Sequence, residues 1–144
     1  MKMRRVLVLV LVGVGALGGS LVRAYSLGQE VSAYLLAAED PMDMWRDGWI
    51  HVEYSGPDHV LGWVEQLEEA RAQFVALDAP EPAKRFHGTV ELAMGSVIEL
   101  ALAMGARADR EIMDEKMVRA LQLSKRVDQE EESLRSRHMW WMRD

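Results

Sequence analysis

The chain begins with basic residues followed by a long uncharged run, and this arrangement constrains its fold more than any other feature. Lys2, Arg4 and Arg5 precede 17 uncharged residues, Val6 to Val22, that are rich in valine, leucine and glycine. A basic start followed by an apolar stretch is typical of an export signal. The run is also at the short limit for a membrane-spanning helix, which needs roughly 17–25 residues. Residues 1–24 are therefore predicted to be a signal peptide or a signal-anchor.

Both fates of this segment place the rest of the chain on the same side of the membrane. Val22-Arg23-Ala24 allows cleavage after Ala24, which would give a secreted or periplasmic protein, whereas retention would leave residues 6–22 as a membrane anchor. The basic start stays in the cytoplasm by the positive-inside rule. Residues after about 25 are therefore expected to be extracytoplasmic, with membrane contact through residues 6–22 if the segment is uncleaved.

Composition narrows the classes of function. The 144 residues carry a net charge of −6, and leaving out the first 24, which hold four basic and no acidic residues, lowers it to −10. So acidic a chain lacks the basic surface that nucleic acids require. It has no cysteine, which excludes disulfides and thiolate metal sites. A chain of this length forms one small domain with a modest core, so a protein partner or self-association is expected.

Residues 25–55 are predicted to form a short helix and an irregular aromatic loop. The helix covers 29–40 because apolar residues recur there at helical spacing: Val31, Tyr34, Leu35 and Ala38. Pro41 is expected to end it, since proline disfavours the helical conformation of the preceding residue. An uncleaved N-terminal segment would join it as one long helix interrupted near Gly28.

The rest of residues 25–55, from Pro41 to Ser55, is predicted to be a loop packed on the bundle. Ile50, Val52 and Tyr54 alternate like a strand, but no partner strand is visible in the sequence.

Residues 56–137 are predicted to form a three-helix antiparallel bundle. Ser55 is expected to cap the first helix, which has proline in its first turn. Pro80 and Pro82 are expected to make a tight turn and to open the second helix. Its apolar residues cover nearly all faces, so it should be central, and its 15-residue apolar stretch and Glu99 argue against a second membrane span. Apolar spacing predicts a third helix from about Arg110 to Arg137, and residues 138–144 form a tail.

The predicted fold class is therefore all-α: an N-terminal hydrophobic signal or anchor helix followed by a small antiparallel up-and-down helical bundle. Short connections between consecutive helices require neighbours to run in opposite directions.

Two groups of residues are candidate metal ligands. The first, His51, Glu53, Asp58 and His59, straddles a Gly-Pro turn and lacks the helical histidine pair of a zinc site, so a polar loop is favoured. The second could hold Cu(I), which prefers thioether and imidazole ligands: Met42, Met44, His138 and Met139, with Met104, Met113 and Met117 near the last helix. Methionines at helical spacing are more often core residues, so no metal or cofactor is assigned.

His87 is the candidate for an acid–base residue, and the sequence favours a structural role. It lies on the predicted buried face, where an imidazole usually hydrogen-bonds a loop carbonyl. Only Glu91 is near it in sequence, and no nucleophile or phosphate-loop motif accompanies it. His87, Pro82 and Ser55 are therefore interpreted as structural, and the chain is not expected to be an enzyme.

The stretch from Leu77 to His87, LDAPEPAKRFH, resembles a helix-start pattern of small exported bacterial helical proteins to which no activity is assigned. In these a proline opens a helix and a histidine follows about one turn later. The resemblance covers about residues 60–105 and implies a helical extracytoplasmic module with no catalytic role. The leading interpretation is thus a non-enzymatic interaction or envelope protein. The alternative is a periplasmic binder of copper or a small ligand that uses Met, Trp and His.

Overall fold

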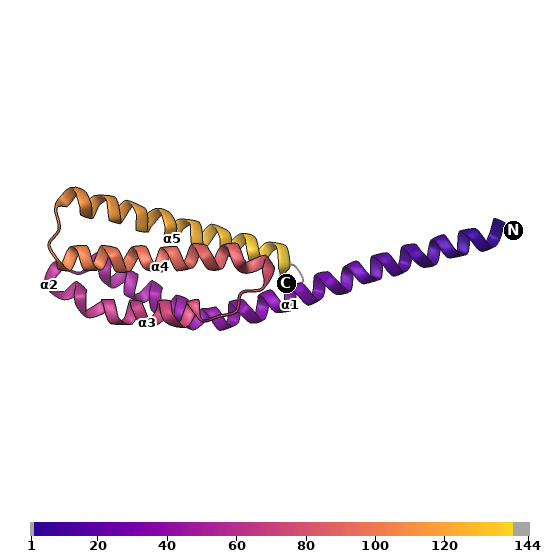
Figure 1. The fold of residues 1–144 in the computed structure, drawn as a ribbon, viewed down its shortest axis with the longest axis horizontal. Helices are drawn as coiled ribbons and strands as arrows, with labels where there is room; N and C mark the ends of the chain where they lie inside the picture. Colours follow the sequence, from indigo (N-terminus) through magenta and orange to yellow (C-terminus); the bar gives the residue numbers. More distant parts are fainter. Residues whose placement is uncertain (1, 140–144) are drawn as a thin grey trace.

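The computed structural model describes the backbone of residues 2–139 and the side chains of residues 20–139. Within this range the chain is helical and contains no strand (Figure 1). Four helices form the fold, and the helical pieces in chain order are α1 (Lys2–Tyr54), α2 (Pro57–Val60), the 3₁₀ turn η1 (Leu61–Trp63), α3 (Val64–Val75), the 3₁₀ turn η2 (Glu81–Ala83), α4 (Lys84–Gly105) and α5 (Arg110–His138). The predicted all-helical class is confirmed.

The four helices form an antiparallel up-and-down bundle from which the N-terminal half of α1 projects (Figure 1). The second half of α1, together with α3, α4 and α5, encloses one hydrophobic core. We name the end of the bundle from which α1 emerges the exit end; η2 and the last turn of α5 lie there, while α2 lies at the opposite end.

Helix α1 corrects three expectations about residues 25–55. It is one 53-residue helix that continues through Pro41, so the predicted end at Pro41 is wrong. The stretch 41–54 is helical rather than a loop, and the predicted interruption near Gly28 is absent because Gly28 lies inside the helix.

The physical reason is burial on both sides of Pro41. An internal proline removes one hydrogen bond and costs about 3 kcal/mol. The side chains that follow it continue the same helical face into the core, and each large one contributes roughly 1.5–3 kcal/mol when fully buried. This face comprises Val31, Tyr34, Leu35, Ala38, Met42, Trp45 and Val52. Ile50, Val52 and Tyr54 do not form a strand: they lie in α1, where Val52 faces the core and is fully buried while Ile50 and Tyr54 are exposed.

The predicted cap at Ser55 is also wrong. The Ser55 backbone N–H donates to the His51 carbonyl at 2.8 Å, so this residue ends α1. Gly56 is the N-cap of α2 and makes no side-chain capping bond. Pro57 opens α2 as predicted, because its fixed φ suits the first helical position.

Helix α4 is the central helix, as the sequence predicted. It contacts α1, α2, α3 and α5, and its buried residues include Val90, Met94, Val97 and Ala101. Among the described residues, only the segment Glu81–Gly105 is long and apolar enough to cross a membrane, although half of its most apolar 18-residue window is buried in the protein. The prediction that the apolar stretch of α4 is too short to span a membrane is thus corrected, because the length and composition of this segment alone would allow a span. Core helices of soluble proteins meet the same criterion.

A hydrogen-bonded turn joins α4 to α5. The Ala108 N–H donates to Ala103 O and the Arg107 N–H to Met104 O, both at 3.0 Å. This is the Schellman arrangement, whose C′ residue, here Arg107, takes a left-handed conformation with φ 53°. Asp109 is the N-cap of α5, but its side chain makes no capping bond.

Candidate functional site

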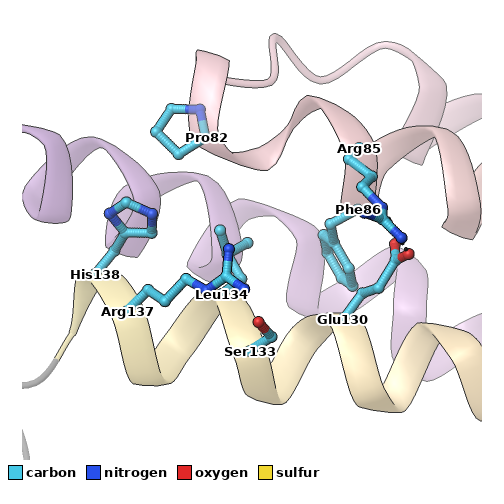
Figure 2. Close-up of a pocket in the computed structure, with 8 residues that line it drawn as sticks. All are labelled: Pro82, Arg85, Phe86, Glu130, Ser133, Leu134, Arg137 and His138. Carbon is cyan, nitrogen blue, oxygen red and sulfur yellow. Dashed lines mark hydrogen bonds and ion pairs between the residues drawn. The ribbon is translucent and has the colours of Figure 1, made fainter.

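A pocket lies at the exit end, between the start of α4 and the last two turns of α5. It encloses about 220 Å³. Figure 2 shows that α4 and the preceding turn contribute one wall and α5 the other. The lining residues are Pro82, Arg85, Phe86, Glu130, Ser133, Leu134, Arg137 and His138. Apolar Phe86 and Leu134 form its floor beneath polar and basic side chains.

The carboxylate of this pocket is already neutralised. Glu130 Oε1 accepts from Arg85 Nε at 3.1 Å and from Arg126 Nε at 3.0 Å. Burial alone would raise the pKa of Glu130, but the Thr89 hydroxyl and the guanidinium groups of Arg126 and Arg85 hold it below its usual value. Glu130 is therefore ionised at neutral pH and is engaged by two cations.

Arg137 gives the pocket its net positive character. Among residues 20–139 no ion pair to Arg137 or to His138 is found, and Figure 2 shows the Arg137 guanidinium between α4 and α5. An arginine without a carboxylate partner offers a planar set of donors that matches the oxygens of a phosphate or carboxylate. These donors make the pocket suited to an anionic ligand.

His87 lies in an aromatic cluster between α1, α3 and α4. Its Nδ1 is 2.9 Å from the Tyr34 hydroxyl, and its ring stacks on Phe74 with centroids 4.7 Å apart. Phe86 meets Tyr34 edge-on. Burial raises the pKa of the Tyr34 phenol well above its usual value, so it stays protonated. The hydrogen-bond partner of His87 is therefore the Tyr34 phenol from α1 and not the expected loop carbonyl. Glu91, the only acid near His87 in the sequence, pairs instead with Arg71 at 3.4 Å.

The first group of candidate metal ligands does not converge. His51 stacks face to face on Trp63 with centroids 3.8 Å apart. Asp58 pairs with Arg107 at 2.8 Å, while Glu53 and His59 are exposed. Among the described residues, no group of three or more His, Asp or Glu side chains is placed to hold a metal ion.

The candidate copper ligands are also dispersed. Met42 is buried in the core, and the partly buried Met44, Met104, Met117 and Met139 pack against that core. Met113 is partly buried on α5. His138 lines the exit-end pocket. Residues 140–144, which include the tail tryptophans, lie outside the described residues.

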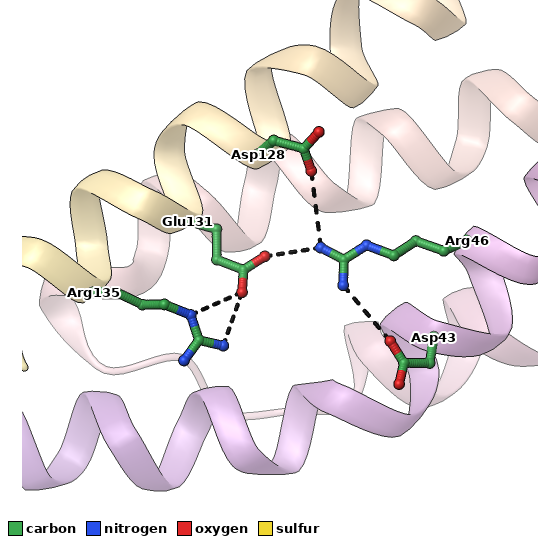
Figure 3. Close-up of polar contacts among 5 residues, drawn as sticks. All are labelled: Asp43, Arg46, Asp128, Glu131 and Arg135. Atoms are coloured by element: carbon green, nitrogen blue, oxygen red, sulfur yellow. Dashed lines mark hydrogen bonds and ion pairs between the residues drawn. The ribbon is translucent and has the colours of Figure 1, made fainter. Parts of the chain in front are cut away.

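A polar cluster that the sequence did not indicate links α1 to α5 (Figure 3). Arg46 Nη2 lies 2.9 Å from Glu131 Oε2 and 3.9 Å from Asp128, and its Nη1 lies 3.6 Å from Asp43. Arg135 completes the cluster at 2.8 Å from Glu131. Because the predicted loop 41–55 contains Arg46, local sequence patterns could not place this residue opposite α5. Nearby on α1, the Trp45 indole N–H is buried, and no acceptor for it is found within residues 20–139.

Comparison of the chain with the profiles of known protein families, with curated protein sequences and with solved structures finds no match. The resemblance of residues 77–87 to exported bacterial proteins therefore stays a prediction.

Proposed function

We propose that the protein is a membrane-anchored extracytoplasmic helical bundle that acts as a non-enzymatic interaction or envelope module. One observation carries the proposal: α1 is a single helix that joins the apolar run 6–22 directly to the bundle core. An apolar helix that projects from its own bundle needs another apolar environment, and the lipid bilayer supplies one. A helix can lie in lipid because its backbone N–H and C=O groups are hydrogen-bonded within the helix.

The first described side chains of the projecting part support this environment. Leu21 is 65% and Val22 70% exposed, so the bundle covers neither of them. Arg23 follows at the boundary, where a long basic side chain reaches toward the headgroups.

The continuity of α1 favours the anchor over the cleaved signal peptide. Ala24, the residue before the candidate cleavage site, lies inside the helix. Proteolysis favours exposed loops, so cutting here first requires local unfolding of α1.

The non-enzymatic part of the proposal is supported by how the reactive side chains are used. The imidazole of His87 is held by Tyr34 and Phe74, and the pocket carboxylate Glu130 is held by Arg85 and Arg126. The side chains of His87 and Glu130 are therefore both engaged in contacts within the fold.

The test is the intact mass of the protein in fractionated cells. The proposal predicts the full 16.3 kDa chain in the membrane fraction, resistant to alkaline carbonate washing. A species that lacks residues 1–24 and is found in the soluble extracytoplasmic fraction would refute the anchor.

A further inference from the structure

The exit end of the bundle lies close to the membrane surface, if α1 is the proposed anchor. The apolar run ends at Val22, and from residue 20 onward, where the side chains are described, the first buried residue of α1 is Gly28. Six residues of helix rise about 9 Å. The headgroup layer on each side of a bilayer is about 5–8 Å thick. A continuous helix therefore leaves no room for a long spacer, and the exit end begins at the outer edge of the headgroup layer.

The pocket between α4 and α5 lies at this same end. Its walls are the first turn of α4 and the last turns of α5, which Figure 1 places beside the point where α1 emerges. The contact between Tyr34 of α1 and His87 of α4 confirms that the start of α4 lies level with the first buried turns of α1.

The pocket is basic on a molecule that is otherwise acidic. Its lining carries Arg85, Arg137 and His138 against a single carboxylate, Glu130, which Arg85 and Arg126 already neutralise. By contrast, the part of the chain after residue 24 has a net charge of −10, since the total of −6 includes four basic residues before that point. An anionic bilayer repels such a body except where cations face it.

We propose that this pocket binds the phosphate of an anionic phospholipid in the leaflet that faces the bundle. Arg137 is the principal ligand because it has no ion-pair partner among residues 20–139, and His138 lies beside it. Arg85 pairs with Glu130 Oε1 and so offsets the negative charge that this carboxylate brings to the pocket. The contact fixes the orientation of the bundle on the membrane, which a single anchor helix leaves free to rotate. This inference rests on the proposed function, since it requires α1 in the bilayer.

The experiment uses the full chain in nanodiscs that contain phosphatidylglycerol and phosphatidylcholine in equal amounts, with retained lipids identified by native mass spectrometry. We expect the wild-type chain to retain phosphatidylglycerol preferentially. Arg137→Gln should lower this preference about fivefold, because one basic residue near a charged membrane contributes on that order. Lys125→Gln is the matched control. It removes an exposed cation from the same helix, more than three turns before Arg137 and outside the pocket lining, and should leave the preference unchanged.

Three outcomes overturn the inference. The first is an unchanged preference in a folded Arg137→Gln chain, and His138→Gln serves as the second variant if circular dichroism shows that Arg137→Gln loses helix. The second is an equal loss in Lys125→Gln, which would show unspecific charge attraction. The third comes from hydrogen exchange of residues 133–138 in detergent: protection by millimolar inorganic phosphate equal to that by phosphatidylglycerol assigns the pocket to a free anion.

Failure of the anchor is distinguished on the same samples. If the wild-type chain does not stay in washed membranes, the proposed function fails. If wild type and Arg137→Gln both stay there but neither selects phosphatidylglycerol, only the lipid site fails.

Discussion

At the scale of single residues, Arg107 occupies a conformation that its side chain disfavours. Its φ of 53° lies in the left-handed region, which costs a residue with a Cβ roughly 1–2 kcal/mol relative to glycine. Its ion pair with Asp58 is exposed and therefore contributes about 0–1 kcal/mol.

Replacing Arg107 by glycine is therefore expected to raise the free energy of unfolding by about 0.5–1 kcal/mol. Arg107→Ala is the control, because it loses the same ion pair but keeps the Cβ, and its stability should not rise. Urea unfolding of the purified chain measures both. Equal stability of the two variants would show that the left-handed conformation carries no strain.

The interpretation of His87 as a structural residue is tested by removing its contacts. His87→Ala loses the hydrogen bond to Tyr34 and the stacking on Phe74, which contribute about 0.5–1.5 kcal/mol each. Tyr34→Phe loses only the hydrogen bond and should be less destabilised. His59→Ala, at an exposed histidine, is the control. A melting temperature of His87→Ala equal to that of wild type would reject the structural role.

The same cluster predicts how stability depends on pH. Burial raises the pKa of Tyr34, so the native chain keeps its phenolic proton at a pH where the unfolded chain, with a pKa of about 10, releases it. The stabilisation of the native state that results from this difference in pKa is complete below pH 10 and is lost as the pH rises above 10. We expect Tyr34→Phe to show a shallower fall in the free energy of unfolding between about pH 9.5 and 11 than wild type. Parallel curves in urea titrations across this range would contradict the argument.

At the scale of elements, helices α4 and α5 were predictable and the middle of α1 was not. In α4 and α5 local spacing and packing agree: Val90, Met94 and Val97, or Ala120 and Val127, recur at helical steps and are fully buried. At Pro41 the local rule favours an end to the helix, and only burial of Met42 and Trp45 against other helices outweighs it. Those partners are distant in sequence, so a reading of local preferences could not include them.

The candidate site was less predictable than the fold for the same reason. His87 and Pro82 were singled out as structural; His87 lies in the first turn of α4 and Pro82 in the preceding turn η2, but the partner of His87 is Tyr34, 53 positions away. Arg85 and Arg137 were not singled out, since only the antiparallel pairing of α4 and α5 brings them to one pocket.

Two helical glycines test the packing of α1 on α3. A Cβ at Gly48 would lie 2.7 Å from Cδ2 and 3.2 Å from Cγ of the fully buried Leu67, whereas a Cβ at Gly88 meets nothing within 4 Å. Gly88→Ala should raise the free energy of unfolding by about 0.5–1 kcal/mol, because alanine favours helix. Gly48→Ala gains the same preference but overpacks Leu67, at a cost of about 1–3 kcal/mol, so its stability should fall below that of Gly88→Ala. Equal gains in urea unfolding would show that α1 and α3 are not in close contact at Gly48.

At the scale of the whole molecule, one helix contains both the apolar run that we propose as the anchor and part of the bundle core. The apolar run 6–22 and the core residues from Val31 to Val52 belong to the same α1, so the direction of the anchor sets the direction of the bundle. Three cations at the start of the chain favour a cytoplasmic N-terminus. On the topology proposed above, the strongly acidic bundle lies outside the cytoplasm, with its basic pocket toward the lipid.

The side of the membrane on which the bundle lies is the central claim, and a pair of reporter fusions behind Asp144 measures it directly. Alkaline phosphatase folds only outside the cytoplasm, so the account predicts an active phosphatase fusion and a dark cytoplasmic fluorescent-protein fusion at this position. A fluorescent cytoplasmic fusion together with an inactive phosphatase would place the bundle inside the cell and contradict the account.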